Sequence, residues 1–232
     1  MERIGLLGGT SWPSTIEYYR LLNEKAQAHF GEGHSARLLL SSMDYFEIRQ
    51  HYPEGWDNIY PILQRELQYL NDLNPSCILI CNNTLHQAYD AIKDELNLSV
   101  PVFHMADLTA QYLHQQGHKK VLLTGTQYTM ESGYYSDKIA AYGIEVMVPV
   151  LEERVLMQSM QQSIAKGHAT EQFSAAFEAI LANYTNCDAV ITACTELPLV
   201  ITSNITPLVI VDPMAIQCEA AFKFACAIPN QG

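Results

Sequence analysis

Two short stretches of the sequence combine residue types that could carry acid–base chemistry. Ala193-Cys-Thr-Glu196 places a thiol next to a hydroxyl and a carboxylate, and Cys81-Asn-Asn-Thr-Leu-His86 groups amides, a hydroxyl and an imidazole. A thiolate can remove or return a proton, but a free cysteine has a pKa of about 8.5 and needs assistance to ionise at neutral pH. Both stretches follow apolar runs that predict strands, and parallel sheets bind ligands at the ends of their strands.

The elements that must position these residues repeat along the chain. Strand-like apolar runs alternate with helical patterns, which predicts βαβ units and parallel sheets. Gly8-Gly-Thr10 ends the first predicted strand, and Thr124-Gly-Thr126 ends a strand near the start of the second half. The two halves therefore look like weak internal copies, with chance similarity between two such lobes as the alternative.

We predict an α/β fold of two pseudo-symmetric, doubly wound lobes with parallel sheets and the active site in the cleft between them. The expected segments are 1–105 for the first lobe, 106–208 for the second lobe, and 209–232 for a closing strand end and helix that return to the first lobe. At the level of single elements, we expect a helix over 14–28 and a strand over 102–104. The helix is expected to bury Ile16, Tyr19, Leu21 and Leu22.

Composition limits the class of protein. The chain has 232 residues, of which 48% are hydrophobic and 16% charged, so disorder is not expected. The formal net charge of −12 is spread along the chain, without a stripe of Lys and Arg that could neutralise a nucleic-acid backbone. No apolar run approaches the roughly 18 residues needed to cross a bilayer, and the N-terminus reads as a strand and not as a signal segment. We expect a cytoplasmic protein that binds neither nucleic acid nor membrane.

The six cysteines do not form a recognisable metal or disulfide pattern. No Cys-x-x-Cys occurs, and disulfide frameworks are rare in the cytoplasm. Structural zinc needs four converging ligands, which the spacing does not offer, so no metal is expected. The segment Gly5-x-x-Gly-Gly9 lacks the glycine spacing of a dinucleotide-binding loop, and we expect no nucleotide cofactor.

Four collinear segments resemble one family. The opening Gly5-Leu-Leu-Gly-Gly-Thr-Ser-Trp12, continuing to Asn23, resembles the N-terminal signature of the aspartate/glutamate racemases. The segments Cys81 to His86, Gly125 to Glu131 and Cys194 to Glu196 resemble that family in the same order. The resemblance implies a homodimeric enzyme that needs no pyridoxal phosphate or other cofactor. It also implies two residues, one on each face of the substrate, that remove and return the α-proton.

The resemblance assigns the chemistry to Cys194 and to position 82. Cys194 would act on the L-enantiomer, with its ionisation assisted by the N-terminus of a following helix. The partner acid/base in the first lobe is usually cysteine or threonine, but this chain has Asn82, whose amide does not usefully exchange protons near neutral pH. Cys81 does not replace it, because neighbouring side chains on a strand point to opposite faces, and we interpret Cys81 as a core residue.

The remaining expected site residues would recognise the substrate's carboxylates. Turn hydroxyls, amides and backbone N–H groups would bind the α-carboxylate, and Arg49 would bind the side-chain carboxylate. Lys166 stands beside the position of the family's second-lobe lysine and is either a ligand or a solvated helix end, while His86 orients the first-lobe turn or caps its helix. The expected substrate-binding residues are Thr10, Ser11, Arg49, Asn83, Thr84, Thr126, Thr129, Thr195 and Glu196.

Together these features predict a racemase of aspartate or glutamate that uses a thiolate at Cα. Because Asn82 replaces the usual second acid/base, turnover is expected to be one-directional from the L-enantiomer. Two alternatives stay open on the sequence: a one-cysteine decarboxylase or isomerase of a related dicarboxylate, and a catalytically silent amino-acid-binding protein.

Overall fold

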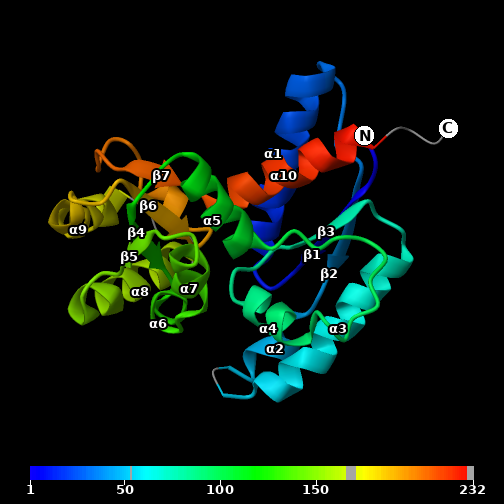
Figure 1. Ribbon diagram of the computed structural model, residues 1–232, viewed down its shortest axis with the longest axis horizontal. Helices are drawn as coiled ribbons and strands as arrows, with labels where there is room; N and C mark the ends of the chain where they lie inside the picture. The colour runs from blue at the N-terminus through cyan, green and yellow to red at the C-terminus, as the bar shows by residue number, and fades with distance from the viewer. Residues whose placement is uncertain (53, 166–170, 229–232) are drawn as a thin grey trace. The chain divides into compact units, whose positions relative to one another are not determined.

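The computed structural model describes residues 1–52, 54–165 and 171–228 (Figure 1). The chain divides into two compact units. The first comprises Met1–Met105 and the C-terminal residues from Met214, and the second comprises Ala106–Pro213. Each unit holds one sheet in which all paired strands are parallel. The prediction of an α/β fold with two parallel sheets is therefore confirmed.

The first unit has the strand order β2-β1-β3, with β1 (Ile4–Gly8) between β2 (Leu38–Ser42) and β3 (Cys77–Ile80). One face of β1 and β3 packs against α1 (Trp12–Phe30) and α10 (Pro213–Ala227) in one apolar cluster. These two helices cross close together in Figure 1. The opposite face packs against α2 (Tyr45–Arg49), α3 (Trp56–Asp72) and α4 (Leu85–Ile92). The residues of β1 and β3 are all buried, as expected for parallel strands that are covered on both faces.

Helix α1 buries only part of the side that was expected: Leu22 is buried and Leu21 packs against the same apolar cluster, as predicted, whereas Ile16 and Tyr19 are not buried. Ser11 caps the helix through its side chain, and Pro13 follows in the first turn, where the missing N–H costs nothing. The buried positions are Ser14, Thr15, Tyr18, Leu22 and Ala26, whereas Ile16 and Tyr19 are more than half exposed. The reason is tertiary: Thr15 Oγ1 accepts a hydrogen bond from the N–H of Gly9, which turns the small residues of the first turn towards the end of β1.

The strand expected over 102–104 is reduced to one bridge. Val102 pairs with Ile78 of β3 in a parallel bridge, and Phe103 N–H donates to the Ile78 carbonyl at 3.0 Å. The chain then enters α5 (Met105–Gln115), which begins before another pair of residues can join the sheet. Of the strand expected over 102–104, only Val102 is therefore paired with β3.

The second unit has the strand order β5-β4-β6-β7. Its strands are β4 (Lys120–Gly125), β5 (Glu145–Met147), β6 (Ala189–Ala193) and β7 (Val209–Val211). Its helical elements after α5 are α6 (Gln127–Glu131), α7 (Tyr134–Ala140), α8 (Leu151–Ala165), α9 (Glu171–Leu181), η1 (Ala182–Tyr184) and η2 (Leu197–Leu199). The order β5-β4-β6 repeats the order β2-β1-β3 of the first unit, as duplication would produce.

Strand β7 pairs with β6, so the strand end expected to return with the closing helix lies in the second sheet.

The core of the second unit lies between its sheet and helices α8 and α9. Leu122 of β4 and Val190 of β6 pack with Met157, Phe177 and Ile180 from these helices. Cys194, which follows β6, belongs to the same apolar cluster. The thiol highlighted by the sequence therefore lies at the edge of a hydrophobic core.

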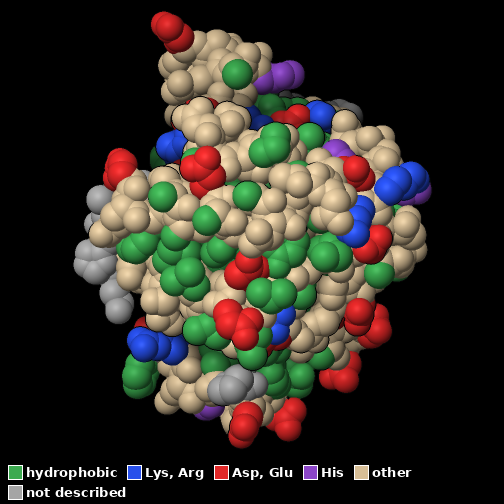
Figure 2. Space-filling view, turned by 90° about the vertical axis from the view of Figure 1, so that its left-hand side faces the viewer, with side chains coloured by type: hydrophobic (Ala, Val, Ile, Leu, Met, Phe, Trp, Pro, Cys, Tyr) green, Lys and Arg blue, Asp and Glu red, His purple; other side chains and the backbone are tan. Residues whose placement is uncertain are grey.

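The surface agrees with the charge pattern of the sequence. On the face seen in Figure 2, basic side chains stand singly among acidic ones and do not form a stripe. Hydrophobic side chains are exposed on α8, where Leu151 and Val155 are about half accessible, at 53% and 51%. Within the ranges that the structure describes, no helix is both long and apolar enough to cross a membrane.

Candidate active site

A thiol and a carboxylate lie in direct contact after strand β6. Cys194 is 8% exposed, and its Sγ–H donates to Oε2 of Glu196 at 2.9 Å. The Thr195 hydroxyl donates to the same oxygen, also at 2.9 Å. The sequence interpretation placed Glu196 among the substrate-binding residues, and in the structure its carboxylate contacts the thiol.

The surroundings keep the Cys194 thiol protonated. Burial raises the pKa of Cys194 well above its usual value, and the Glu196 charge together with the hydrogen bond to that carboxylate raises it further. The backbone N–H groups of Glu196 and Thr195 act in the opposite direction. The expected assistance from a helix N-terminus is absent, because the next described element is the three-residue 3₁₀ turn η2. Ionisation of this thiol therefore requires a proton acceptor, and the Glu196 carboxylate lies within hydrogen-bond distance of it.

The turn after β4 lies beside the Cys194 turn, because Gly125 pairs with Ala193 across the sheet. Thr126 caps α6 by accepting the N–H of Thr129 at 3.1 Å, and the two hydroxyls contact each other at 2.9 Å. Thr129 is 1% exposed, so its hydroxyl serves the turn. Thr126 is only half-buried and is the better placed of the two expected substrate contacts.

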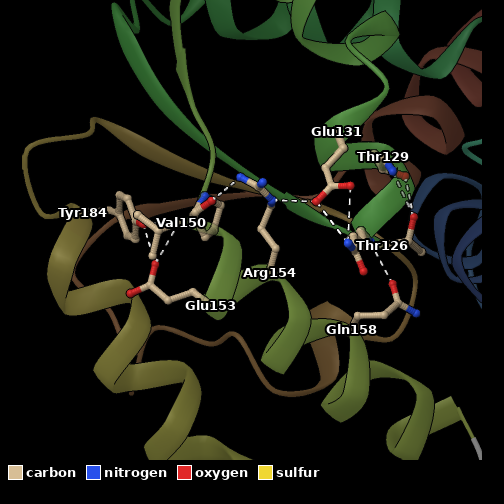
Figure 3. A network of polar contacts seen from close by, with 10 residues as sticks. Thr126, Thr129, Glu131, Val150, Glu153, Arg154, Gln158 and Tyr184 are labelled. Atoms are coloured by element: carbon tan, nitrogen blue, oxygen red, sulfur yellow. Dashed lines mark hydrogen bonds and ion pairs between the residues drawn. The ribbon is translucent and has the colours of Figure 1, made fainter.

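Helix α8 fixes this turn through side chains that the sequence interpretation did not identify (Figure 3). Gln158 Oε1 accepts the backbone N–H of Gln127 at 2.7 Å. Arg154 forms an ion pair with Glu131 at 2.9 Å and donates to the Pro149 carbonyl at 2.8 Å. No local sequence signal marks the contacts of Gln158 with Gln127 and of Arg154 with Glu131, since these partners are more than twenty residues apart.

The corresponding turn of the first unit contains Asn82. Its amide Nδ2 donates to Thr10 Oγ1 at 3.1 Å, and its Oδ1 accepts the N–H of Leu85 at 2.9 Å. Asn82 thus joins the ends of β1 and β3 and caps the first turn of α4. Thr10 is 5% exposed and participates in the same contact. This amide has a clear structural role in addition to any role towards substrate.

The other expected residues of the first unit also follow strand ends. Ser11 caps α1 and accepts the Ser14 hydroxyl at 2.7 Å, so it serves the helix. Asn83 and Thr84 are partly exposed in the turn before α4. Arg49 is the last residue of α2, and its side chain is exposed at the position that follows β2. Helix α2 was not predicted, because its five residues are too few to show helical periodicity.

Cys81 lies in the core, as the sequence indicated. It is 1% exposed, packs with Leu79 and Cys218, and burial raises the pKa of its thiol well above the usual value. Lys166 lies outside the described residues. Among the residues that are described, no group of three or more His, Cys, Asp and Glu side chains could hold a metal ion.

The fold and the Cys194 turn define a class of protein: a two-unit parallel α/β protein with a buried thiol in contact with a half-buried carboxylate at a strand end. The model of the Asp/Glu/Hydantoin racemase family matches residues 7–221, which is nearly the whole chain. The chain therefore belongs to the Asp/Glu/Hydantoin racemase family.

Solved structures agree with this assignment. A candidate Asp/Glu racemase from Yersinia pestis is 33% identical with a TM-score of 0.88, over 97% of this chain and 100% of that one. An aspartate racemase homologue from Pyrococcus horikoshii OT3 is 29% identical with a TM-score of 0.84, over the same shares. The aspartate racemase of Picrophilus torridus, at 23% identity, shares the fold with a TM-score of 0.79 over 97% of this chain and 95% of its own.

Proposed function

We propose that this chain is an isomerase that inverts the α-carbon of an acidic amino acid, aspartate or glutamate, without a cofactor. The observation that carries the proposal is the contact of 2.9 Å between Cys194 Sγ and Glu196 Oε2 at the end of a parallel strand. The contact brings a sulfur that can act as a base next to a proton acceptor, and the chain belongs to a family of racemases.

The proton transfer that we propose uses the pair as one unit. The thiol proton passes to the Glu196 carboxylate, and the resulting thiolate removes the α-proton of the L-enantiomer. The electron pair left on Cα is delocalised into the adjacent carboxyl group. Because both transfers take place within the pair and its substrate, the step does not depend on hydroxide from solvent.

Recognition of the substrate is assigned to donors at the strand ends. Thr126 and Thr195 offer half-buried hydroxyls in the second unit, and Asn83 and Thr84 lie in the equivalent turn of the first unit. Arg49 offers a guanidinium that binds a carboxylate through two parallel hydrogen bonds. That both turns serve one substrate stays a prediction from the sequence, as do the homodimer and the cytoplasmic location.

Return of the proton on the opposite face is the step for which Asn82 matters. An amide is not a proton donor of useful strength near neutral pH, and both ends of this amide are hydrogen-bonded within the first unit. We therefore propose that the proton is supplied by water on that face. Because the two enantiomers have equal free energy, kcat/KM is the same in both directions, so a weak donor on that face slows inversion of either enantiomer. Exchange of the α-proton of the L-enantiomer, which needs Cys194 alone, is then faster than inversion.

One observation favours a second candidate, a one-cysteine decarboxylase of a related dicarboxylate. Burial and Glu196 hold the pKa of Cys194 high, so the thiol is protonated at rest. A protonated thiol is the group that a decarboxylase needs in order to protonate a carbanion from one face. The two candidates differ in the bond that breaks at Cα, which is C–H in one and C–C in the other.

The test is α-proton exchange in deuterated water. L-Aspartate and L-glutamate should each be incubated with the enzyme, followed by NMR of the α-position and chiral analysis of the product. We expect loss of the α-proton signal and slow appearance of the D-enantiomer, both abolished in Cys194→Ser. Cys226→Ser is the matched control, because it makes the same change at a partly exposed cysteine on α10, in the first unit.

The outcomes separate the candidates. Release of CO₂ from a dicarboxylate without α-proton exchange on either amino acid would favour the decarboxylase. Saturable binding without exchange or CO₂ would leave an amino-acid-binding protein. Exchange that survives in Cys194→Ser would contradict the assignment of the thiol.

A further inference from the structure

A buried chain of polar side chains connects helix α10 to the Asn82 turn within the first unit. Gln217 of α10 and His86 of α4 are both fully buried, at 0% exposure. The amide nitrogen Nε2 of Gln217 lies 3.2 Å from Nε2 of His86. On the other side of the ring, His86 Nδ1 lies 3.0 Å from the backbone carbonyl of Asn82.

The orientation of the Gln217 amide follows from its other two neighbours. Its nitrogen lies 2.7 Å from the Phe103 carbonyl, which can only accept a hydrogen bond. Its oxygen lies 2.6 Å from the hydroxyl of the fully buried Tyr18, which donates to it. A flipped amide would place two acceptors against each other at Phe103, so the NH₂ group must face both Phe103 and His86.

The amide in turn determines the tautomer of His86. A ring nitrogen that faces an NH₂ group must accept, so Nε2 carries no proton. The proton of the neutral ring is then on Nδ1, where it meets a carbonyl that can only accept. The two sides of the ring require the same tautomer independently.

The network also opposes a second proton on His86. An imidazolium would direct its Nε2–H at the NH₂ group of Gln217, with two donors and no acceptor between them. The neighbouring ring of His104 packs edge-on at a centroid distance of 4.6 Å, and its Nε2 lies 3.3 Å from Oδ2 of Asp90.

From this geometry we infer that Gln217, oriented by Tyr18, is a positioning residue that locks His86 as the neutral Nδ1–H tautomer. In that form the ring holds the Asn82 carbonyl and so fixes the turn at residues 82–84. His86 is then not a proton donor or acceptor in the reaction. This inference deepens the proposed function, because that turn carries the donors assigned to the substrate carboxylate.

The tautomer can be measured without any activity assay. The full chain would be labelled with ¹⁵N-histidine, and the ring nitrogens observed in long-range ¹H–¹⁵N spectra, with His86→Gln to assign the signal among the eight histidines. We expect Nδ1 protonated and Nε2 unprotonated, with no titration between about pH 5.5 and 8, where an exposed histidine titrates. An Nε2–H tautomer, or titration in that window, would overturn the inference.

Substitution of the amide should change the protonation state. Gln217→Glu places a carboxylate against His86 Nε2, so both ring nitrogens should carry protons at neutral pH. Gln162→Glu is the matched control, because it makes the same change at an exposed position of α8. A folded Gln217→Glu protein whose His86 spectrum equals that of the wild type would contradict the inference, and if this variant does not fold, the wild-type spectrum still decides the tautomer.

The link to the reaction is tested with Gln217→Met, which keeps the volume but removes the donor. We expect kcat/KM for α-proton exchange to fall about 10-fold or more, because the turn loses its anchor. A wild-type kcat/KM in this variant would show that the network only stabilises the fold. Absence of exchange in the wild type would count against the proposed function and leave the tautomer result intact.

Discussion

Glu196→Gln tests the thiol–carboxylate pair most directly. The substitution keeps the size and hydrogen-bonding ability of the side chain but removes its charge and its capacity to take a proton. Because the Glu196 carboxylate raises the pKa of Cys194, the pKa of the thiol should fall in the variant, while burial continues to raise it. The thiolate is then easier to form, yet the thiol proton has no acceptor within the site.

The expected loss of rate follows from the loss of the proton acceptor. Removal of a general base typically costs about 10²-fold or more. We therefore expect exchange at neutral pH to be about 100-fold slower than in the wild type.

The pH dependence gives the sharper measurement. In the wild type the thiol proton moves to Glu196 inside the site, so exchange should be nearly flat between about pH 6 and 9. In Glu196→Gln the proton must leave to solvent, so the rate should rise about tenfold per pH unit below the pKa of the thiol. The two curves should approach each other as the pH increases.

The assay combines initial rates of α-deuterium incorporation with thiol alkylation, which reports the pKa of Cys194 directly. Glu152→Gln, an exposed acidic residue of α8, is the control for the change in net charge. The reasoning is refuted if the wild-type rate itself rises tenfold per pH unit. It is equally refuted if the variant shows a lowered thiol pKa and an undiminished rate at neutral pH.

The remaining predictions concern the first-unit turn, one glycine and one surface carboxylate. Asn82→Cys supplies a second thiol and should raise D-to-L turnover at least about tenfold, at a cost of about 1–2 kcal/mol for lost hydrogen bonds; unchanged turnover contradicts the one-sided mechanism. Gly9 has φ +92°, and an added Cβ would lie 2.1 Å from the Met43 carbonyl oxygen. Gly9→Ala should therefore lower the free energy of unfolding in denaturant by at least about 2 kcal/mol, clearly more than Gly143→Ala, which has a similar φ but open space. Two backbone N–H groups hold the pKa of Asp188 below its usual value, so its stabilisation is present above the unfolded pKa and is lost as the pH falls through the folded one. Asp188→Asn should lower Tm at neutral pH and have less effect in acid, as calorimetry across pH would show.

The sequence determined the features that depend on local pattern. Apolar runs of four or five residues predicted strands, and their alternation with helices predicted parallel sheets in two halves. The motif around Cys194 could be placed at the end of a strand for the same reason, and Cys81 could be assigned to the core from the alternation of side chains. These inferences succeed because strand and helix periodicity are set by the backbone itself.

Other features depended on partners that are distant in the sequence. Hydrophobicity alone suggested that Ile16 and Tyr19 are buried, but contacts at the end of β1 selected Ser14 and Thr15 instead. The helix dipole that was expected to assist ionisation of Cys194 is missing, because the chain forms only a short 3₁₀ turn where a helix was expected. The direction of the Glu196 side chain is set by the folding of the same turn.

The clearest case is His86. Its motif showed an imidazole close to the Asn82 turn, but not which ring nitrogen carries the proton. That is decided by Gln217, 131 residues away, whose amide is oriented by a carbonyl and a hydroxyl from two further segments. Local pattern thus determined which residues stand at the strand ends. Tertiary packing decided where their protons lie, because hydrogen bonds in a buried network are fixed by partners brought together only by the fold.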